Sequence, residues 1–186
     1  MIQINTLNIV DGTTLNIDVQ VKSASYYTNV YIDTIKIDNQ DTFVSSGPSN
    51  TPKYTYTAGD NEKSKVLALN AANMSGVDLS KDLLFVYVTT KGTPSSDTPC
   101  GEDNTVTTGV VTYMYPIYTK GISYAKELEE NCGCKINKLF IDFILQLNAF
   151  EFAVKTKNYQ EALNYWKLFY NNINDIAVTS TCNCNG

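Results

Sequence analysis

The stretch from Cys132 to Cys184 decides the fold, and it reads CGCKINKLFIDFILQLNAFEFAVKTKNYQEALNYWKLFYNNINDIAVTSTCNC. Apolar residues recur at i, i+3, i+4 and i+7 over about 135–154 and again over about 159–176. This spacing is typical of helices that each bury one face. Only the four residues 155–158 join the two segments, and so short a connection predicts an antiparallel helical hairpin.

The two helices of this hairpin differ in pattern. Ile141, Leu145 and Phe152 give the first helix a second apolar face, so we expect it to be covered on more than one side. Asn158 is placed to cap the second helix, and Glu161 follows three residues later, which is close to a capping box.

The hairpin returns the chain to the end where it began, so Cys132 and Cys134 are expected near Cys182 and Cys184. Four thiolates could hold one zinc ion tetrahedrally, and a helix N-terminus near residue 135 favours the thiolate form. However, one residue separates the cysteines of each pair, whereas paired ligands of structural zinc usually have two to four residues between them. Two disulfides between the pairs, or four free thiols, are the alternatives.

The first part of the chain is β-structured. Apolar and polar residues alternate strictly over 15–22, which predicts a strand with one wet face, and Asp11-Gly12 before it signals a tight turn. The phase of the apolar residues changes within 29–38, which predicts a bulge or bend near Asp33-Thr34. Residues 83–90 are apolar on both faces, as in a central strand. Residues 45–60 and 91–104 are expected to be long polar loops, and 106–117 to close the sheet.

Composition limits the function. The chain of 186 residues has a net charge of −5 and no basic stripe, which argues against direct reading of a nucleic acid. It contains no histidine, which removes the commonest general acid–base group and the commonest zinc ligand. We expect no signal peptide, no membrane span and synthesis in a cytoplasm, where cysteines stay reduced. No glycine-rich phosphate loop is present, so we predict no enzymatic activity.

Acidic residues occur in two groups, Asp33/Asp38/Asp41 and Asp78/Asp82. Such carboxylates are usually solvated surface; a calcium site or a hydrolase with two carboxylates is the less favoured alternative. The 13 tyrosines favour a protein interface, against the plainer reading that β-sheets are rich in tyrosine.

Two motifs resemble a known family. Residues 27–38, YTNVYIDTIKID, with 40–43, QDTF, are similar to part of a virion protein of crAss-like bacteriophages. So is 131–136, NCGCKI, which leads to LFIDFILQL at 139–147. The resemblance covers about half of the chain. It implies a structural subunit of the neck or tail that repeats around a symmetric ring and is made in the bacterial host cytoplasm. It transfers no catalytic residue.

The sequence therefore predicts an α+β protein. An antiparallel β-sandwich-like domain spans 1–118, a helical domain with a short helix and the hairpin spans 119–178, and a cysteine-bearing tail spans 179–186. The predicted function is that of a non-enzymatic ring subunit in a phage virion, in contact with copies of itself and with neighbouring portal or tail proteins. Its only predicted cofactor is one zinc ion, if any. The alternative is a monomeric module that binds a glycan or a host surface through the β-domain loops.

Overall fold

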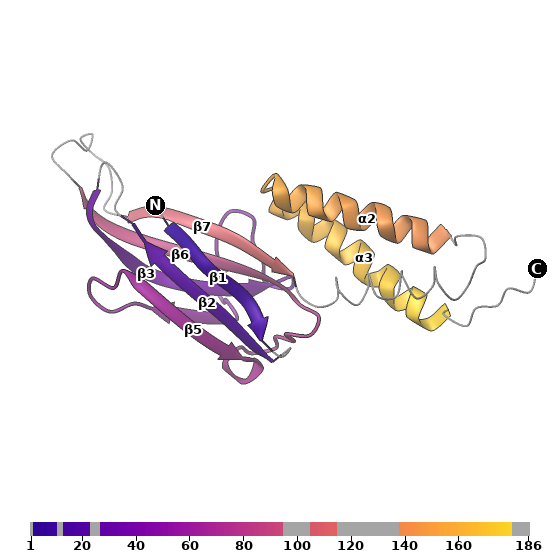
Figure 1. Ribbon diagram of the computed structural model, residues 1–186, viewed down its shortest axis with the longest axis horizontal. Coiled ribbons are helices and arrows are strands. Elements are labelled where there is room, and N and C mark those ends of the chain that lie inside the picture. The colour runs from indigo at the N-terminus through magenta and orange to yellow at the C-terminus, as the bar shows by residue number, and fades with distance from the viewer. Residues whose placement is uncertain (1, 11–12, 23–26, 95–104, 115–137, 180–186) are drawn as a thin grey trace, which may run out of the picture. The chain divides into compact units, whose positions relative to one another are not determined.

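The computed structural model describes residues 2–10, 13–22, 27–94, 105–114 and 138–179, and it divides the chain into two compact units, 1–113 and 114–186 (Figure 1). The predicted boundary at 118/119 and the predicted short helix before the hairpin lie outside the described residues. The described residues of the first unit form strands and a short 3-10 turn, and those of the second unit form two helices. The predicted α+β class, with a β-domain before a helical hairpin, is confirmed.

One sheet of the β-unit has the order β1-β2-β5, with strands Ile2–Val10, Thr14–Val21 and Ser64–Asn70. All of its pairings are antiparallel. The alternation predicted for β2 is confirmed, because Leu15, Ile17 and Val19 are fully buried while Gln20 is exposed. A 3-10 turn, η1 (Ala71–Asn73), follows β5 and begins with a capping box on Asn70.

The other sheet has the order β4-β3-β6-β7, with strands Tyr54–Thr57, Tyr27–Asn39, Leu83–Pro94 and Thr105–Met114. The predicted bulge is confirmed: the register of β3 against β6 shifts between Ile32 and Thr34, leaving Asp33 as the extra residue. Because of this shift, Ile32 and Ile35 lie on the same face of the sheet although they are three residues apart. β6 is central and buried, as predicted.

The two sheets stack face to face to form the predicted sandwich (Figure 1). Its core joins the inward residues of β2 and β5 to those of β3 and β6. The segment between β4 and β5 ties the sheets together at one edge: Ile32 N–H donates to the Glu62 carbonyl at 2.7 Å, and Val21 N–H donates to the Lys63 carbonyl at 2.8 Å.

Two loop predictions were wrong in part. Residues 45–60 contain β4, whose Tyr-Thr repeat supports a strand although prolines and glycines surround it. Residues 91–94 continue β6, because the bulged β3 extends far enough to pair with them. A second register shift there lies between Thr28 and Tyr31, beside Asn29 at φ 53°. Opposite this shift is Gly92, where a Cβ would lie 3.2 Å from Val30 Cγ2.

The second unit contains α2 (Lys138–Lys155) and α3 (Tyr159–Thr179), which confirms the predicted hairpin. Phe143, Leu147 and Phe150 of α2 are buried, as are Ala162, Leu163 and Trp166 of α3. Between the helices, Asn172 Nδ2 donates to Gln146 Oε1 at 2.7 Å.

The turn between the helices serves both of them. At the end of α2, Asn158 N–H donates to the Ala153 carbonyl and Lys157 N–H to the Val154 carbonyl, the pattern of a Schellman motif. Lys157 takes the left-handed position (φ 59°) that glycine usually occupies. Asn158 then caps α3 through Glu161 N–H at 3.4 Å, but the Glu161 carboxylate accepts from the Asn158 side chain rather than from its backbone.

Candidate functional site

In the described part of the β-unit, the buried carboxylates lie where β3 ends and β6 begins. We call Asp38, Asn39, Gln40 and Asp82 the carboxylate cluster. Asp38 and Asn39 are completely buried and Asp82 is 4% exposed. Burying a carboxylate is unfavourable unless its oxygens accept hydrogen bonds, so the partners of these groups decide what the cluster can do.

Asp38 holds the loop that covers the outer face of its sheet. Its Oδ1 accepts from Thr42 Oγ1 at 3.1 Å and from Ser49 Oγ at 2.9 Å, and its Oδ2 accepts from Ser49 N–H at 3.1 Å. Tyr87 lies beneath the same loop and donates to the Val44 carbonyl at 2.9 Å. Burial, together with the negative charge of Asp38, raises the pKa of the Tyr87 phenol above its usual range.

Asp82 ties three segments together. Its Oδ2 accepts from Asn39 Nδ2 at 3.1 Å and from Asp78 N–H at 2.9 Å, and its Oδ1 accepts from Gln40 Nε2 at 2.9 Å. Gln40 in turn accepts from Leu83 N–H at 3.1 Å, where β6 begins. Asp82 therefore fixes the end of β3, the 78–82 turn and the start of β6 against one another.

The carboxylate cluster is a structural network. Every carboxylate oxygen of Asp38 and Asp82 already accepts at least one hydrogen bond from the protein. Within the described ranges, no group of histidine, cysteine, aspartate or glutamate side chains is arranged to hold a metal ion. The acidic group that the sequence suggested, Asp33/Asp38/Asp41, does not form one site. Asp33 instead forms an ion pair with Lys91, at 2.6 Å.

Sequence reasoning found the acidic members of the cluster but missed Gln40 and Ser49. Both are polar residues in or beside a turn, which is where most such residues are solvated, so no local signal marked them. Their roles depend on contacts made across 42 and 11 residues respectively.

A second polar group connects the two sheets at the β4–β5 edge. Tyr56 of β4 donates to Glu62 Oε2, and Lys65 of β5 lies 3.5 Å from Glu62 Oε1 and 4.3 Å from the centre of the Tyr56 ring. The hydrogen bond from Tyr56 lowers the pKa of the Glu62 carboxyl, and the charge of Lys65 adds to this effect. One of the tyrosines expected at an interface therefore also stabilises the sandwich.

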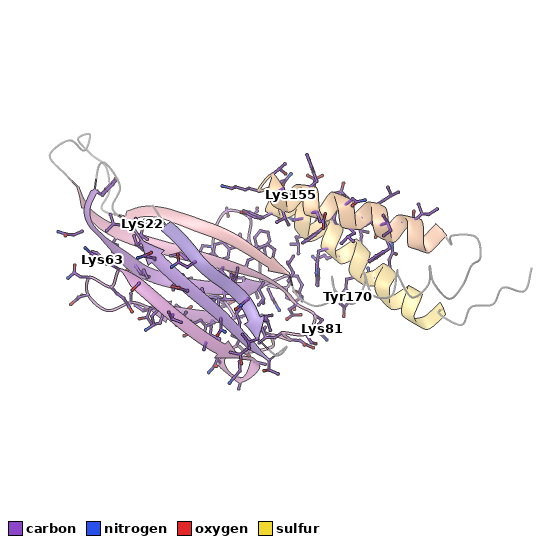
Figure 2. The ribbon with its side chains drawn as sticks, viewed as in Figure 1. Lys22, Lys63, Lys81, Lys155 and Tyr170 are labelled. Carbon is purple, nitrogen blue, oxygen red and sulfur yellow. The ribbon has the colours of Figure 1, made fainter. Side chains whose placement is uncertain are left out.

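The remaining conspicuous feature is apolar. On α2, Ile141, Leu145 and Phe152 are 47%, 61% and 68% exposed. They lie on the side of the helix opposite Phe143, Leu147 and Phe150, which face α3. We call Ile141, Leu145 and Phe152 the outer face of α2. Figure 2 shows the side chains of the hairpin and labels Lys155, where α2 ends beyond Phe152.

The four cysteines proposed as zinc ligands, Cys132, Cys134, Cys182 and Cys184, all lie outside the described residues. Zinc, disulfides and free thiols therefore remain alternatives. Among the helices that the structure describes, none is both long and apolar enough to cross a membrane.

Comparison with known proteins identifies the family. The family model for Crassvirus tail hub protein A matches residues 2–185. The chain belongs to this family. It is also 38% identical over 207 aligned positions to tail hub protein A of Bacteroides phage crAss001, covering 95% of both chains.

Membership of the Crassvirus tail hub protein A family confirms the resemblance to crAss-like phage virion proteins. It makes the chain a structural component of a phage tail, and hence of the virion. It agrees with the geometry, because the buried carboxylates that could have suggested catalysis are engaged in holding loops and strand ends in place.

Proposed function

We propose that this protein is a non-enzymatic subunit of a ring in the phage tail, assembled from copies of itself around the axis that runs from the portal through the tail. The observation that carries the proposal is the tail hub family match, which extends over both the β-unit and the helical unit. Because each copy in a closed ring presents the same two surfaces, a head-to-tail contact repeated by rotation suffices for assembly.

The described surface supports this proposal in two ways. The outer face of α2 leaves three large apolar side chains exposed, and β5 adds Val66, which is 69% exposed. Single exposed apolar residues are ordinary, but three on one helical stripe are typical of a surface that another element covers. Tyr31 and Tyr54 are half-buried on strands of the β-unit, where their rings can still contact a neighbour.

The test is native mass spectrometry and negative-stain electron microscopy of the purified protein over a concentration series, under reducing conditions. The same measurements are repeated after co-expression with the other tail proteins of the phage. We expect closed oligomers of one copy number, or stoichiometric co-assembly with a neighbouring tail protein. A protein that stays monomeric in both settings and instead binds glycans on an array would favour the alternative of a recognition module.

A further inference from the structure

β5 is an edge strand of the β1-β2-β5 sheet (Figure 1), and among the described strands only β2 pairs with it. Edge strands are usually protected from pairing with other chains by bulges, prolines or charges, or by being short. β1 contains a register shift and β4 has only four residues. β5, by contrast, lies opposite β2 in unbroken register over Ser64–Asn70. Its one charged residue, Lys65, is paired with Glu62 and lies over the Tyr56 ring.

The hydrogen-bond pattern shows which backbone groups of β5 point away from β2. Val21 N–H donates to the Lys63 carbonyl at 2.8 Å, so these two opposite residues form a hydrogen-bonded pair. Such pairs alternate with non-hydrogen-bonded pairs along an antiparallel ladder. The odd-numbered residues of β5 therefore bond to β2, and the even-numbered residues turn their backbone groups away from it. We call the N–H and C=O groups of Ser64, Val66 and Ala68 the open edge of β5.

Other parts of the protein close both ends of the open edge. At one end, the Glu62 carbonyl accepts from Ile32 N–H at 2.7 Å. At the other end, Asn70 N–H donates to Asn73 Oδ1 at 2.9 Å. The three residues between these closed ends have exposed, uncharged side chains, and Val66 is the middle one.

We propose that the open edge of β5 pairs with β5 of a second copy of this chain, antiparallel to it, about a two-fold axis beside Val66. In this register Val66 lies opposite Val66 of the second copy and Ser64 lies opposite Ala68, so every open N–H meets an open C=O. Two β-branched residues opposite each other are favourable, and no like charges meet. A shift of the register by two residues would bring in Asn70 or Glu62, whose backbone groups are already engaged.

The length of the open edge favours a second copy over a strand of another protein. A longer strand would extend past the open edge and face the closed ends at Glu62 and Asn70. β5 of a second copy presents an open edge of the same length, symmetric about Val66. Because each copy has one such edge, the pairing stops at two copies. This contact goes beyond the proposed ring and does not depend on its head-to-tail contact.

The test compares Ala68→Pro with Ala71→Pro in the full chain, by sedimentation velocity over a concentration series under reducing conditions. Proline at position 68 removes an N–H of the open edge and leaves the hydrogen bonds to β2 in place, which edge strands tolerate. Ala71→Pro is the matched control, because Ala71 is exposed, lies beyond the open edge and is the first residue of η1, where proline is also tolerated. Far-ultraviolet circular dichroism checks that both variants fold.

We expect the unsubstituted protein to form a reversible dimer with a dissociation constant in the micromolar to millimolar range, because the contact is small. Ala68→Pro removes one donor from each copy and should raise this dissociation constant about 10-fold or more. Ala71→Pro should change it less than about threefold. If closed rings form, rings of the unsubstituted protein should occur in pairs and Ala68→Pro rings singly.

A charge exchange at Val66 tests the register. Val66→Glu places two carboxylates opposite each other across the axis, beside Asp18 of β2 in each copy, so the variant should be monomeric. An equimolar mixture of Val66→Glu and Val66→Lys should form a dimer with one chain of each kind. Labelling one variant with a heavy nitrogen isotope gives this heterodimer its own mass in native mass spectrometry.

Three results would overturn the proposal. A protein that is still monomeric at about 1 mM has no such contact. If Ala68→Pro associates as tightly as Ala71→Pro, the dimer does not use the open edge of β5. If the mixture of Val66→Glu and Val66→Lys forms no heterodimer, the two Val66 positions do not meet. None of these results bears on the head-to-tail ring, which is tested by the presence of closed oligomers.

Discussion

Replacement of Asp82 by asparagine should destabilise the β-unit much more than a surface substitution does. The carboxylate of Asp82 is 4% exposed and accepts from Asn39, Gln40 and the Asp78 backbone. Asparagine has the same shape, but its NH₂ group must replace one oxygen and will then face a donor. If the NH₂ group lies opposite Gln40, the Gln40 side-chain amide must flip so that its oxygen accepts from the asparagine. The Gln40 oxygen then no longer accepts from Leu83 N–H, which loses its acceptor.

The magnitude follows from these contacts. A hydrogen bond to a charged acceptor contributes about 1.5–3 kcal/mol, and a buried donor left without a partner costs about 1–3 kcal/mol. Asp82→Asn weakens the remaining bonds and orphans at least one donor, so we expect a loss of about 2–4 kcal/mol from the free energy of unfolding. This is a large fraction of the roughly 5–15 kcal/mol that stabilises a typical domain.

Urea unfolding followed by far-ultraviolet circular dichroism near the strand minimum measures this loss. For an m value of about 1–3 kcal/mol/M, the midpoint of unfolding should fall by roughly 0.7–4 M. Asp60→Asn is the matched control, because Asp60 is exposed and its substitution should change stability by less than about 0.5 kcal/mol. If both variants unfold at the same midpoint, the cluster does not hold the strand ends and the reasoning is wrong.

Three further predictions concern other parts of the chain. Lys157→Gly should stabilise the hairpin by about 0.5–1 kcal/mol in urea unfolding followed by Trp166 fluorescence, because glycine relieves the left-handed backbone at φ 59°; Lys155→Gly, inside the last turn of α2, should instead destabilise it by about 1 kcal/mol. Since the folded state raises the pKa of Tyr87, the unfolded state loses this proton first as pH rises above about 10, and stability should fall there with a slope of up to about 1.4 kcal/mol per pH unit. Tyr87→Phe should lack that component of the pH dependence, and equal alkaline slopes for the two proteins would contradict the assignment. If the four cysteines near the ends of the hairpin bind zinc, native mass spectrometry under reducing conditions should show one zinc per chain that a chelator removes, whereas the mass of the bare chain would show the zinc prediction to be wrong.

The features best predicted from sequence are those whose cause is local. The alternation in β2 directly predicts its buried and its solvent-exposed face. The 3.6-residue period predicts the bounds of both helices to within a few residues. The bulge at Asp33 was also predictable, because apolar residues on both sides of it could share one face only if an extra residue intervened.

The features that sequence missed depend on long-range contacts. β4 is four residues long and pairs with the edge that β3 offers it. Its Tyr-Thr repeat favours a strand, but the prolines and glycines around it predict a loop. Asp38 and Asp33 are both aspartates on β3, yet Asp38 is completely buried and Asp33 forms an ion pair with Lys91 on the neighbouring strand. The loop that covers Asp38 makes this difference, and its path cannot be read from local periodicity.

The internal hydrogen bonds of the β-unit bear on how the proposed ring would form. In the β-unit, buried polar groups are satisfied by internal donors, which gives each copy a fixed set of strand ends and loops before it meets a neighbour. Contact between such preorganised surfaces costs little conformational entropy, so an interface with few attractive interactions can still form. In a closed ring the same contact recurs at every interface, and the free energies of many weak contacts add up. Isolated copies should then associate weakly while the complete assembly is stable, and a single surface substitution that is nearly silent in the monomer should have its effect multiplied by the number of interfaces.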